Sequence, residues 1–485
     1  MFELIGPGGV LALLLLGGMI VLIALLELPE MMIAVLLVGQ GFIHMAFALV
    51  GVEITRVNFA LAGTILFLPI VLLMVMGRIL GKGKRQEEVP FFGKGVGTFA
   101  LLVLAFVVLL GVGLTYTQAP WYGAKKFREL LTFGVGPFLM TFLFIRDMKS
   151  VKRLMWWIML MAGFFLVTSM IHSYRVTGDW FPGERLSRDL AFGFVPVLGG
   201  MTMGTRMVHF AGTALVLAWM AKNRIWRVMA GSGLVLILAA AINTSSRSAV
   251  VGMFLLALVL PKLINRGRWG VSLVTSGIMV MVLVGVFVLA PEHTKQTIME
   301  RITRGTTQGT LEAEPRTAVW KTAVEMIGKR PLLGYGTGGF SMYSEGRDAE
   351  SFAHNMFLDA WCENGLPGFV LVAGLWGVVL NRIWKVYHGA PSRSFFFYAA
   401  CWVSALLVGD FVTGMVHWGV AHAANTFLLT SGITLKVCAL SEFEMSKAKT
   451  KTDNSGSGGL VPGRMPAVVW GGGDGQGNAV GAGGK

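Results

Sequence analysis

The stretch VGTFALLVLAFVVLLGVGLTYT at positions 96–117 has no charged side chain and is long enough to cross the hydrocarbon core of a bilayer. Similar apolar runs recur from Leu4 to Cys438. Over the whole chain 54% of residues are hydrophobic and 14% are charged, whereas an average soluble domain has about 25% charged residues. Because the hydrophobicity is continuous and does not alternate, the runs are predicted to be helices and not barrel strands.

We predict an all-α, polytopic membrane bundle of about 12–13 transmembrane helices. The predicted spans lie near 4–26, 31–50, 59–80, 96–117, 129–145, 154–172, 205–221, 228–243, 249–264, 271–290, 366–381, 395–412 and 421–438. The resulting segments are the first ten spans over 1–290, a long loop with short amphipathic helices over 291–365, the last spans over 366–440 and a disordered cytoplasmic tail over 441–485.

The formal net charge of +15 could indicate a nucleic-acid partner, but its distribution argues otherwise. Lysines and arginines cluster in alternate short connections, as they do in cytoplasmic loops. The connection over 118–128 and the loop 291–365 then fall on the opposite, periplasmic side. That loop nevertheless carries eight basic residues between Lys295 and Arg347, so we expect an anionic ligand there and no nucleic acid.

The sequence NTSSRSA at 243–249 joins two predicted spans and contains Arg247. In the simpler interpretation Ser246 caps a helix and the arginine extends to the membrane interface. An arginine at this depth is costly and usually functional, however, and a guanidinium can bind phosphate with two hydrogen bonds. The functional interpretation is therefore favoured.

The segment from Arg316 is predicted to be an amphipathic helix after Pro315, with Val319, Trp320, Ala323, Val324 and Ile327 on one face. Taken alone, it is typical of an interfacial helix with an aromatic anchor. Gly334, Gly336 and Gly338 follow it. A phosphate-binding loop would need a strand before these glycines and a helix after them, so turn glycines are favoured.

His354 and Asn355 precede a stretch with Asp359 and Glu363. If the stretch is helical, His354 and Leu358 share one face, and the two acids share another. The simpler interpretation is a capped helix at the membrane surface with solvated acids. The alternative is that His354 is a general base, since imidazole titrates near neutral pH.

Other polar residues carry less information. No second histidine stands at metal-ligand spacing from His354, and the three cysteines are far apart, so neither a metal site nor a disulfide is expected. His44 and Asp410 are interpreted as isolated polar groups within spans. The residues placed in the last outward turn are His417, Trp418 and His422.

Three blocks of this sequence, in this order, resemble the O-antigen ligase and O-antigen polymerase superfamily of bacterial membrane glycosyltransferases. The blocks are Ser246-Arg247, then Arg316-x-x-x-Trp320 with Pro331-x-x-Gly334-x-Gly336, then His354-Asn355-x-x-Leu358 with Glu363-x-Gly365-x-x-Gly368. The Tyr122-Gly123-x-Lys125-Lys126 segment is also similar to the family. The chain departs from the family pattern at Ser248-Ala249, where Gly-Ala is frequent, and at Phe194-Val195-Pro196, where Asn-Pro is frequent.

The resemblance implies a metal-independent glycosyltransferase of the bacterial inner membrane that needs no cofactor. Its donor would be a glycan on undecaprenyl diphosphate, presented on the periplasmic face. Arg247 and Arg316 would bind the diphosphate, and His354 would accept the proton of the acceptor hydroxyl. Supporting roles are expected for Asn355, Glu363, Trp320, Lys126 and Arg188.

The acceptor distinguishes the members of this superfamily, and the sequence does not identify it. A ligase transfers the glycan to lipid A-core, a polymerase transfers it to the next lipid-linked repeat, and a protein O-oligosaccharyltransferase transfers it to a serine or threonine. A polysaccharide flippase or other transporter is a more distant alternative. It would require buried ionisable pairs within the spans, and the charged residues concentrate in the outer loops instead.

Overall fold

The computed structural model describes residues 29–38, 95–177, 200–243, 247–266, 268–289, 315–416 and 420–455, and positions 292, 295, 296 and 299. These residues are helical apart from short connections and include no strand, which confirms the predicted all-helical class. The chain divides into a main unit, Met1–Phe443, and a small C-terminal unit, Glu444–Lys485.

Fifteen helical elements make up the described residues. They are α2 (Pro29–Val38), α5 (Val96–Leu114), α6 (Pro120–Glu129), η2 (Leu130–Val135), α7 (Gly136–Phe144), α8 (Met148–Thr177), α9 (Gly200–Met220), α10 (Arg224–Asn243), α11 (Arg247–Ile264), α12 (Trp269–Leu289), α14 (Pro315–Lys329), α15 (Gly339–Glu345), α16 (Met356–Gly389), α17 (Phe395–Val416) and α18 (Val420–Ser455).

Seven helical segments among the described residues are long and apolar enough to span a membrane. Each coincides with or overlaps a predicted span, and they are Val96–Leu114, Pro120–Phe144, Arg224–Ala241, Trp269–Leu289, Met356–Gly389, Phe395–Met415 and Thr426–Thr450. The predicted spans at 205–221 and 249–264 correspond to shorter apolar helices. The predicted spans at 4–26 and 59–80 lie outside the described residues, so the total of 12–13 stays a prediction.

Two antiparallel pairings determine which helix ends lie together. Along α5 and α16, Gly95 packs on Arg382 and Gly113 on Asn364. Along α9 and α17, Gly212 packs on Ala405 and Gly409 on His209. These glycines allow close approach because a Cβ atom would fall within 3.0 Å of the facing side chain. The first turns of α16 therefore lie at the same end of the bundle as the end of α5.

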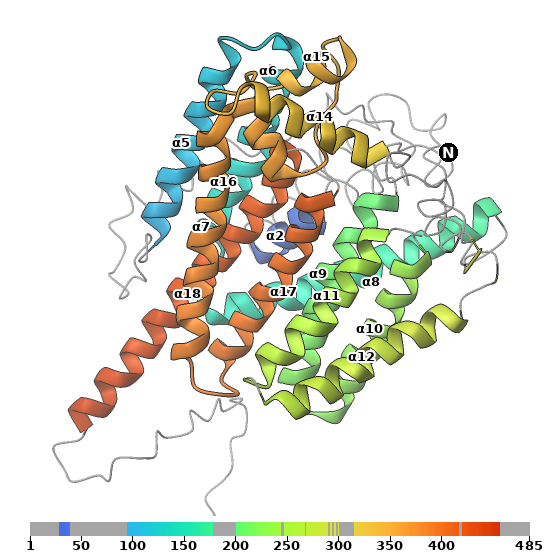
Figure 1. Cartoon of the computed structure of the whole chain (residues 1–485). Coiled ribbons are helices and arrows are strands. Elements are labelled where there is room, and N and C mark those ends of the chain that lie inside the picture. Colours follow the sequence, from blue (N-terminus) through green and yellow to red (C-terminus); the bar gives the residue numbers. More distant parts are fainter. Residues whose placement is uncertain are drawn as a thin grey trace, which may run out of the picture. The chain divides into compact units, whose positions relative to one another are not determined.

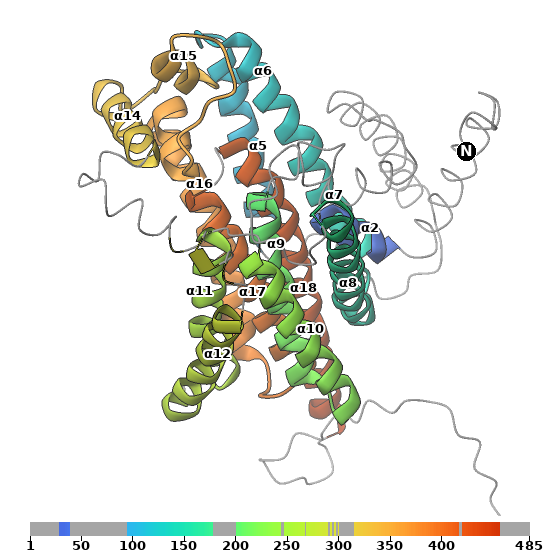
Figure 2. The ribbon, with the colours of Figure 1, turned by 90° about the vertical axis from the view of Figure 1, so that its right-hand side faces the viewer.

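The segments α6, α14 and α15 gather around the first turns of α16 (Figures 1 and 2). The helix α6 begins at Pro120 and continues through the π-helical turn η2 into α7. Pro137 follows η2 and has no N–H to donate to the preceding turn, which accounts for the local widening of the helix. The predicted connection over 118–128 is thus helical from its third residue onward.

The expected disorder from residue 441 onward is wrong for its first part, because α18 continues as a helix to Ser455. The sequence SEFEMSKAKTKTDNS over 441–455 contains good helix formers, and its glutamates precede its lysines by three to five positions. A helix that is already formed over its buried first half also propagates without a new nucleation cost. Residues 456–485 lie outside the described residues.

Candidate active site

His354 lies immediately before the N-cap of α16. The cap is Asn355, whose side-chain oxygen accepts hydrogen bonds from the backbone N–H groups of Phe357 (3.0 Å) and Leu358 (3.2 Å). An asparagine in this role satisfies N–H groups that have no partner within the helix. His354 is consequently outside the helix, and the expectation that it shares a helical face with Leu358 is wrong.

The backbone of His354 is in the left-handed region, with φ of 51°. This conformation costs free energy for a residue with a Cβ atom, although histidine tolerates it better than most, and it occurs preferentially at functional sites. The half-buried imidazole packs against Phe352, with 4.5 Å between the ring centroids. The cap and the ring contact together fix the direction in which the imidazole points.

A buried ion cluster joins α6 to the first two turns of α16, which follow His354 in the chain. The ammonium of Lys126 lies 3.1 Å from Asp359 Oδ2 and 2.7 Å from Glu363 Oε1, and all three side chains are at most 1% exposed. The interpretation of Asp359 and Glu363 as solvated acids is therefore wrong. Because two carboxylates share one lysine, removal of the lysine would leave buried negative charge without compensation.

The second oxygen of Asp359 extends this cluster toward the histidine. Asp359 Oδ1 accepts a hydrogen bond of 3.1 Å from the backbone N–H of Ala353, the residue before His354. His354 is thus bracketed by Ala353, which Asp359 holds, and by Asn355, which caps the helix. This network transmits the position of Lys126 to the backbone of the histidine.

The connection between α15 and α16 is also bound to the start of α6. Asp348 accepts hydrogen bonds from the backbone N–H groups of Trp121 (2.8 Å) and Tyr122 (3.0 Å). A carboxylate at this position complements the positive end of the helix dipole. Lys125 and Glu350 form a more exposed ion pair beside it. The segment that leads to His354 is therefore anchored to α6 at several points.

A glycine-rich loop, residues 330–338, fills the space between α5, α6 and α16. Gly334, Gly336 and Gly338 all have positive φ, and a Cβ atom on any of them would overlap backbone atoms of these helices. The loop N–H groups of Tyr335 and Gly336 bond to the carbonyls of Cys362 and Glu363, at 3.1 and 2.7 Å. These glycines are packing and turn residues, in agreement with the sequence.

Gly365 makes this docking possible. Its φ of 66° interrupts α16 and frees the carbonyls that the loop binds, and Pro367 restarts the helix two residues later. A Cβ atom on Gly365 would overlap the carbonyl of Leu332. The family-like Glu363-x-Gly365 pattern is thus explained by a backbone contact and not by contact with a ligand.

We expect Gly365→Ala to destabilise the protein far more than Gly346→Ala. Both glycines have φ near 67°, which costs an alanine about 1–2 kcal/mol, but Gly346 has open space around its Cβ position whereas Gly365 faces backbone. Thermal unfolding of the two purified variants in detergent measures the difference. Equal melting temperatures would contradict the close packing at Gly365.

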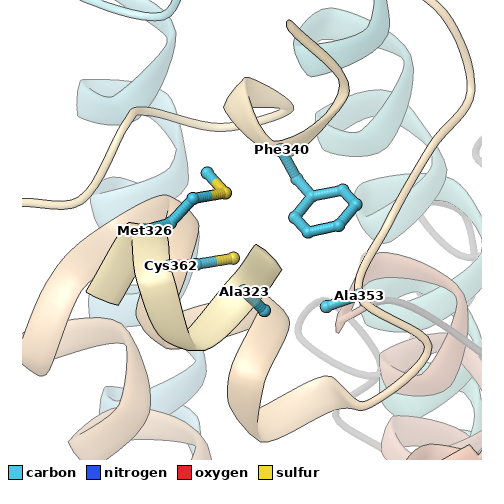
Figure 3. Packing of buried hydrophobic residues seen from close by; sticks show 5 residues of the cluster. All are labelled: Ala323, Met326, Phe340, Ala353 and Cys362. Atoms are coloured by element: carbon cyan, nitrogen blue, oxygen red, sulfur yellow. The ribbon is translucent and has the colours of Figure 1, made fainter. Parts of the chain in front are cut away.

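The helix α14 covers α16 from the outside. Ala323 and Met326 of α14 are buried with Phe340, Ala353 and Cys362, and Figure 3 shows these five side chains facing one another. The predicted amphipathic helix is confirmed, and Val319 and Ile327 pack against the same cluster. The prediction that Val324 belongs to the buried face is wrong, because its side chain is 57% exposed.

A polar link on the surface joins α14 to α15. Lys329 bonds to Glu325 (2.8 Å) and to the Tyr343 hydroxyl (2.6 Å), which itself donates to Glu325. These hydrogen bonds lower the pKa of the Glu325 carboxyl and raise that of the Lys329 ammonium. The three groups are exposed, so their contribution to stability is small.

Arg316 is the second residue of α14 and is partly buried. Trp320, one turn later, has an indole N–H that is buried and lacks an acceptor among the described residues. Since α14 packs on the first turns of α16, Arg316, Trp320 and His354 belong to one compact part of the main unit.

The remaining predicted site residues are described less completely. Arg247 is the first residue of α11, and nothing is described of its side chain. Gly252 of α11 packs on Val208 of α9, and Leu256 of α11 lies near the Cβ position of Gly212 of α9, so the two helices run parallel and their first turns lie at the same end. Outside the described residues lie Arg188, Ser246, His44, His417 and Trp418, and only the helical backbone of His422 is described.

The interpretation of Asp410 as an isolated polar group is wrong. Asp410 Oδ1 lies 3.2 Å from His209 Nε2, and the hydroxyl of Thr430 donates to Oδ2. The partners lie on α9 and α18, so no local pattern along α17 could reveal them. The sequence did contain one signal of these partners: Asp410 is a charged residue within an apolar span, and such residues are normally paired.

The described residues bring a histidine and a basic helix to the first turns of α16. His354 is held in a strained conformation by a buried ion cluster, and the basic helix α14 packs over the same turns of α16. These turns belong to a bundle whose helices are long and apolar enough to span a membrane, as in a multi-pass membrane protein.

A family model described as O-Antigen ligase matches residues 232–373. The match supports membership of the O-antigen ligase superfamily, in agreement with the resemblance seen in the sequence. It supports an O-antigen ligase-like function in surface-polysaccharide biosynthesis and a glycosyltransferase-like enzyme of the ligase or polymerase kind. No curated protein matches the chain significantly.

Proposed function

We propose that this protein transfers a glycan from undecaprenyl diphosphate to a hydroxyl acceptor at the periplasmic face of the bacterial inner membrane. The acceptor we favour is lipid A-core, as for an O-antigen ligase. The observation that carries the proposal is the span of the family match, because residues 232–373 contain Arg247, Arg316 and His354 together.

The proposed reaction forms one bond and breaks one. The acceptor hydroxyl oxygen attacks the anomeric carbon of the donor glycan, and His354 takes the hydroxyl proton. The bond between that carbon and the diphosphate oxygen breaks, and undecaprenyl diphosphate leaves with the electron pair. Arg247 and Arg316 stabilise the negative charge that develops on the diphosphate.

Features of the site support these roles. The hydrogen-bonded neighbours of His354 hold the imidazole in place, so little reorganisation accompanies proton transfer. Arg316 lies in a helix that packs directly on the helix following His354. Asn355, Lys126 and Glu363 act in this proposal as supports of the base, and Trp320 as a support of Arg316.

We expect Arg316→Ala and Arg247→Ala each to lower the transfer rate by about 10²–10³-fold, by analogy with the removal of one charge-stabilising donor. Lysine should restore little activity at either position, because it lacks the planar fork of the guanidinium. Transfer from a purified lipid-linked donor to lipid A-core, followed by gel electrophoresis, measures the effect.

Arg347→Ala is the matched control for these variants, since Arg347 lies in the same part of the chain and, among the described residues, pairs with the nearby Glu345 on the exposed surface. It should transfer at the wild-type rate. Wild-type rates in both test variants would contradict the assignment of the diphosphate site.

A polymerase of the same superfamily is the alternative that the same site allows. The ligase and the polymerase differ in the acceptor, so the assay should offer lipid A-core and lipid-linked repeat units in parallel. A transporter would instead move the lipid-linked glycan without bond exchange. The His209–Asp410 pair is a buried ionisable pair within the spans, as a transporter would need, so transport has to be tested directly.

A further inference from the structure

The tip of the glycine-rich loop, residues 331–333, is apolar and exposed. The exposed fractions of Leu332 and Leu333 are 65% and 73%, and Pro331 before them is exposed as well. Exposed leucines are normal when they occur singly, whereas several that adjoin one another mark a surface that meets a partner or a membrane. The elements beside the tip indicate which of the two it meets.

The loop tip lies level with the end of α5. The hydroxyl of Tyr116, two residues after the last residue of α5, donates a hydrogen bond of 2.8 Å to the carbonyl of Leu333. The face of α5 that leads to Tyr116 carries exposed apolar side chains at helical spacing, namely Leu101, Leu104, Val108 and Val112. Because α5 is long and apolar enough to span a membrane, this face is the one that lipid covers. The tip therefore adjoins the lipid-facing surface of α5.

The apolar part of α16 begins at the same level. The backbone N–H of Leu366 and the indole N–H of Trp361 both donate to the carbonyl of Pro331, at 2.8 and 3.1 Å. Leu366 is the first residue of the predicted span at 366–381, and it is exposed, as is Val370 one turn later. Two spanning helices thus independently place the loop tip at the boundary of the membrane.

The backbone of the tip is suited to contact with lipid. The carbonyl of Pro331 accepts two hydrogen bonds, the carbonyl of Leu333 accepts one, and proline has no N–H that needs a partner. Water satisfies such groups on a solvated loop, whereas polar backbone groups beside lipid need partners within the protein. The donors Tyr116 and Trp361 belong to the residue types that are enriched at membrane–water interfaces. Both observations distinguish this tip from an ordinary surface turn.

We propose that the loop tip docks into the membrane interface, with Leu332 and Leu333 among the phospholipid acyl chains and Lys329 and Arg330 at the level of the headgroups. The occupant is phospholipid because the tip continues the lipid-facing surfaces of α5 and α16, and because exposed basic residues precede it, which anionic headgroups attract. The loop is bonded to the turns of α16 that follow His354, so its docking holds that segment at a constant height above the membrane. This inference rests on the membrane spans and not on glycan transfer.

The experiment uses the purified full-length chain in vesicles of phosphatidylethanolamine and phosphatidylglycerol. Nitroxide labels on Leu332→Cys and Leu333→Cys report collisions with oxygen, which concentrates in lipid, and with a nickel chelate, which stays in water. The ratio of the oxygen rate to the nickel rate should be several-fold higher than for a label on Arg347→Cys, an exposed control in the connection to α16. It should lie between that value and the ratio for Val108→Cys on the lipid-facing side of α5. Because the three native cysteines are buried, labelled wild type gives the background.

Tyr116→Phe tests the hydrogen bond that holds the tip. The substitution leaves the carbonyl of Leu333 without this donor, so the tip should move toward water and the collision ratio of the Leu333 label should fall. Tyr387→Phe is the matched control, because its hydroxyl donates a bond of the same length, 2.8 Å, to the carbonyl of Leu263 at the other end of α16. The control should leave the ratio unchanged. An unchanged ratio in Tyr116→Phe as well would overturn the role given to this bond.

Three results would overturn docking into phospholipid. A collision ratio equal to that of Arg347→Cys would show that the tip faces water. Low collision rates with both reagents, together with dipolar broadening between labels, would show that a second copy of the chain covers the tip. Immobilisation of the label on addition of undecaprenyl diphosphate would assign the tip to the lipid chain of the donor. The collision rates require no turnover, so this test and the transfer assay of the proposed function can fail separately.

Discussion

Replacing His354 with alanine is expected to lower the rate of glycan transfer by about 10²–10⁴-fold, the usual contribution of general acid–base catalysis. Donor binding should be largely retained, because the proposed diphosphate contacts come from arginines. Initial rates at saturating donor, together with binding of undecaprenyl diphosphate, separate the two effects.

His354→Asn distinguishes catalysis from backbone geometry. Asparagine adopts the left-handed conformation readily, so this variant preserves the backbone, φ of 51°, and removes the titrating group. It should be as slow as the alanine variant. His388→Ala is the control, since this exposed histidine of the same helix also stacks on an aromatic ring, at 4.1 Å from Trp384. Wild-type turnover by His354→Asn would make His354 a conformational residue only.

The pH dependence offers a second readout of His354. The base must be neutral to accept a proton, so the wild-type rate should fall as the solution becomes acidic and the imidazole takes up a proton. The residual rate of His354→Asn should lack this acid limb. An unchanged acid limb in the variant would assign the titration to another group.

Lys126→Met is expected to destabilise the protein by about 3–5 kcal/mol, the cost of breaking a buried ion pair by removing one partner. The substitution leaves Asp359 and Glu363 buried, close together and without their cation. Because Asp359 also holds the backbone before His354, any folded fraction should transfer glycan slowly. Equilibrium unfolding in mixed detergent measures the loss of stability.

The neighbouring lysine supplies the matched control. Lys125 pairs with Glu350 at a more exposed position, so Lys125→Met should cost only about 0–1 kcal/mol. Combining Lys126→Met with Asp359→Asn and Glu363→Gln removes the buried charge and should recover much of the stability. Equal losses for Lys125→Met and Lys126→Met would contradict the buried cluster.

The local sequence pattern was sufficient to predict the helices, but it was not sufficient to predict which residues of different helices contact one another. The apolar run at 96–117 and the periodicity after Arg316 correctly predicted α5 and α14, because both depend on neighbours along the chain. The pairing of Lys126 with Glu363 joins residues 237 positions apart. The sequence shows each residue as a charged side chain near a membrane surface, and nothing local indicates that they are buried together.

Asp410 and the end of α18 illustrate the two kinds of error. The partners of Asp410 come from two other helices, so the residue looked isolated when only its own span was considered. The segment over 441–455 looked disordered because it is polar, but it extends a helix that tertiary packing already stabilises. Among the proposed site residues, His354 and Arg316 were predicted from residue type and position, whereas the contacts of Asp359 with Lys126 and Ala353 emerged only from the structure.

The most direct test of the central claim is transfer by the purified protein in detergent, with a glycan on undecaprenyl diphosphate as the only donor and lipid A-core as the acceptor. The account predicts that the glycan appears on the acceptor and that undecaprenyl diphosphate is released in equal amount, and that His354→Asn and Arg316→Ala lose both products. Absence of transfer by the wild type, with movement of the lipid-linked glycan across proteoliposome membranes, would contradict the account and indicate a transporter.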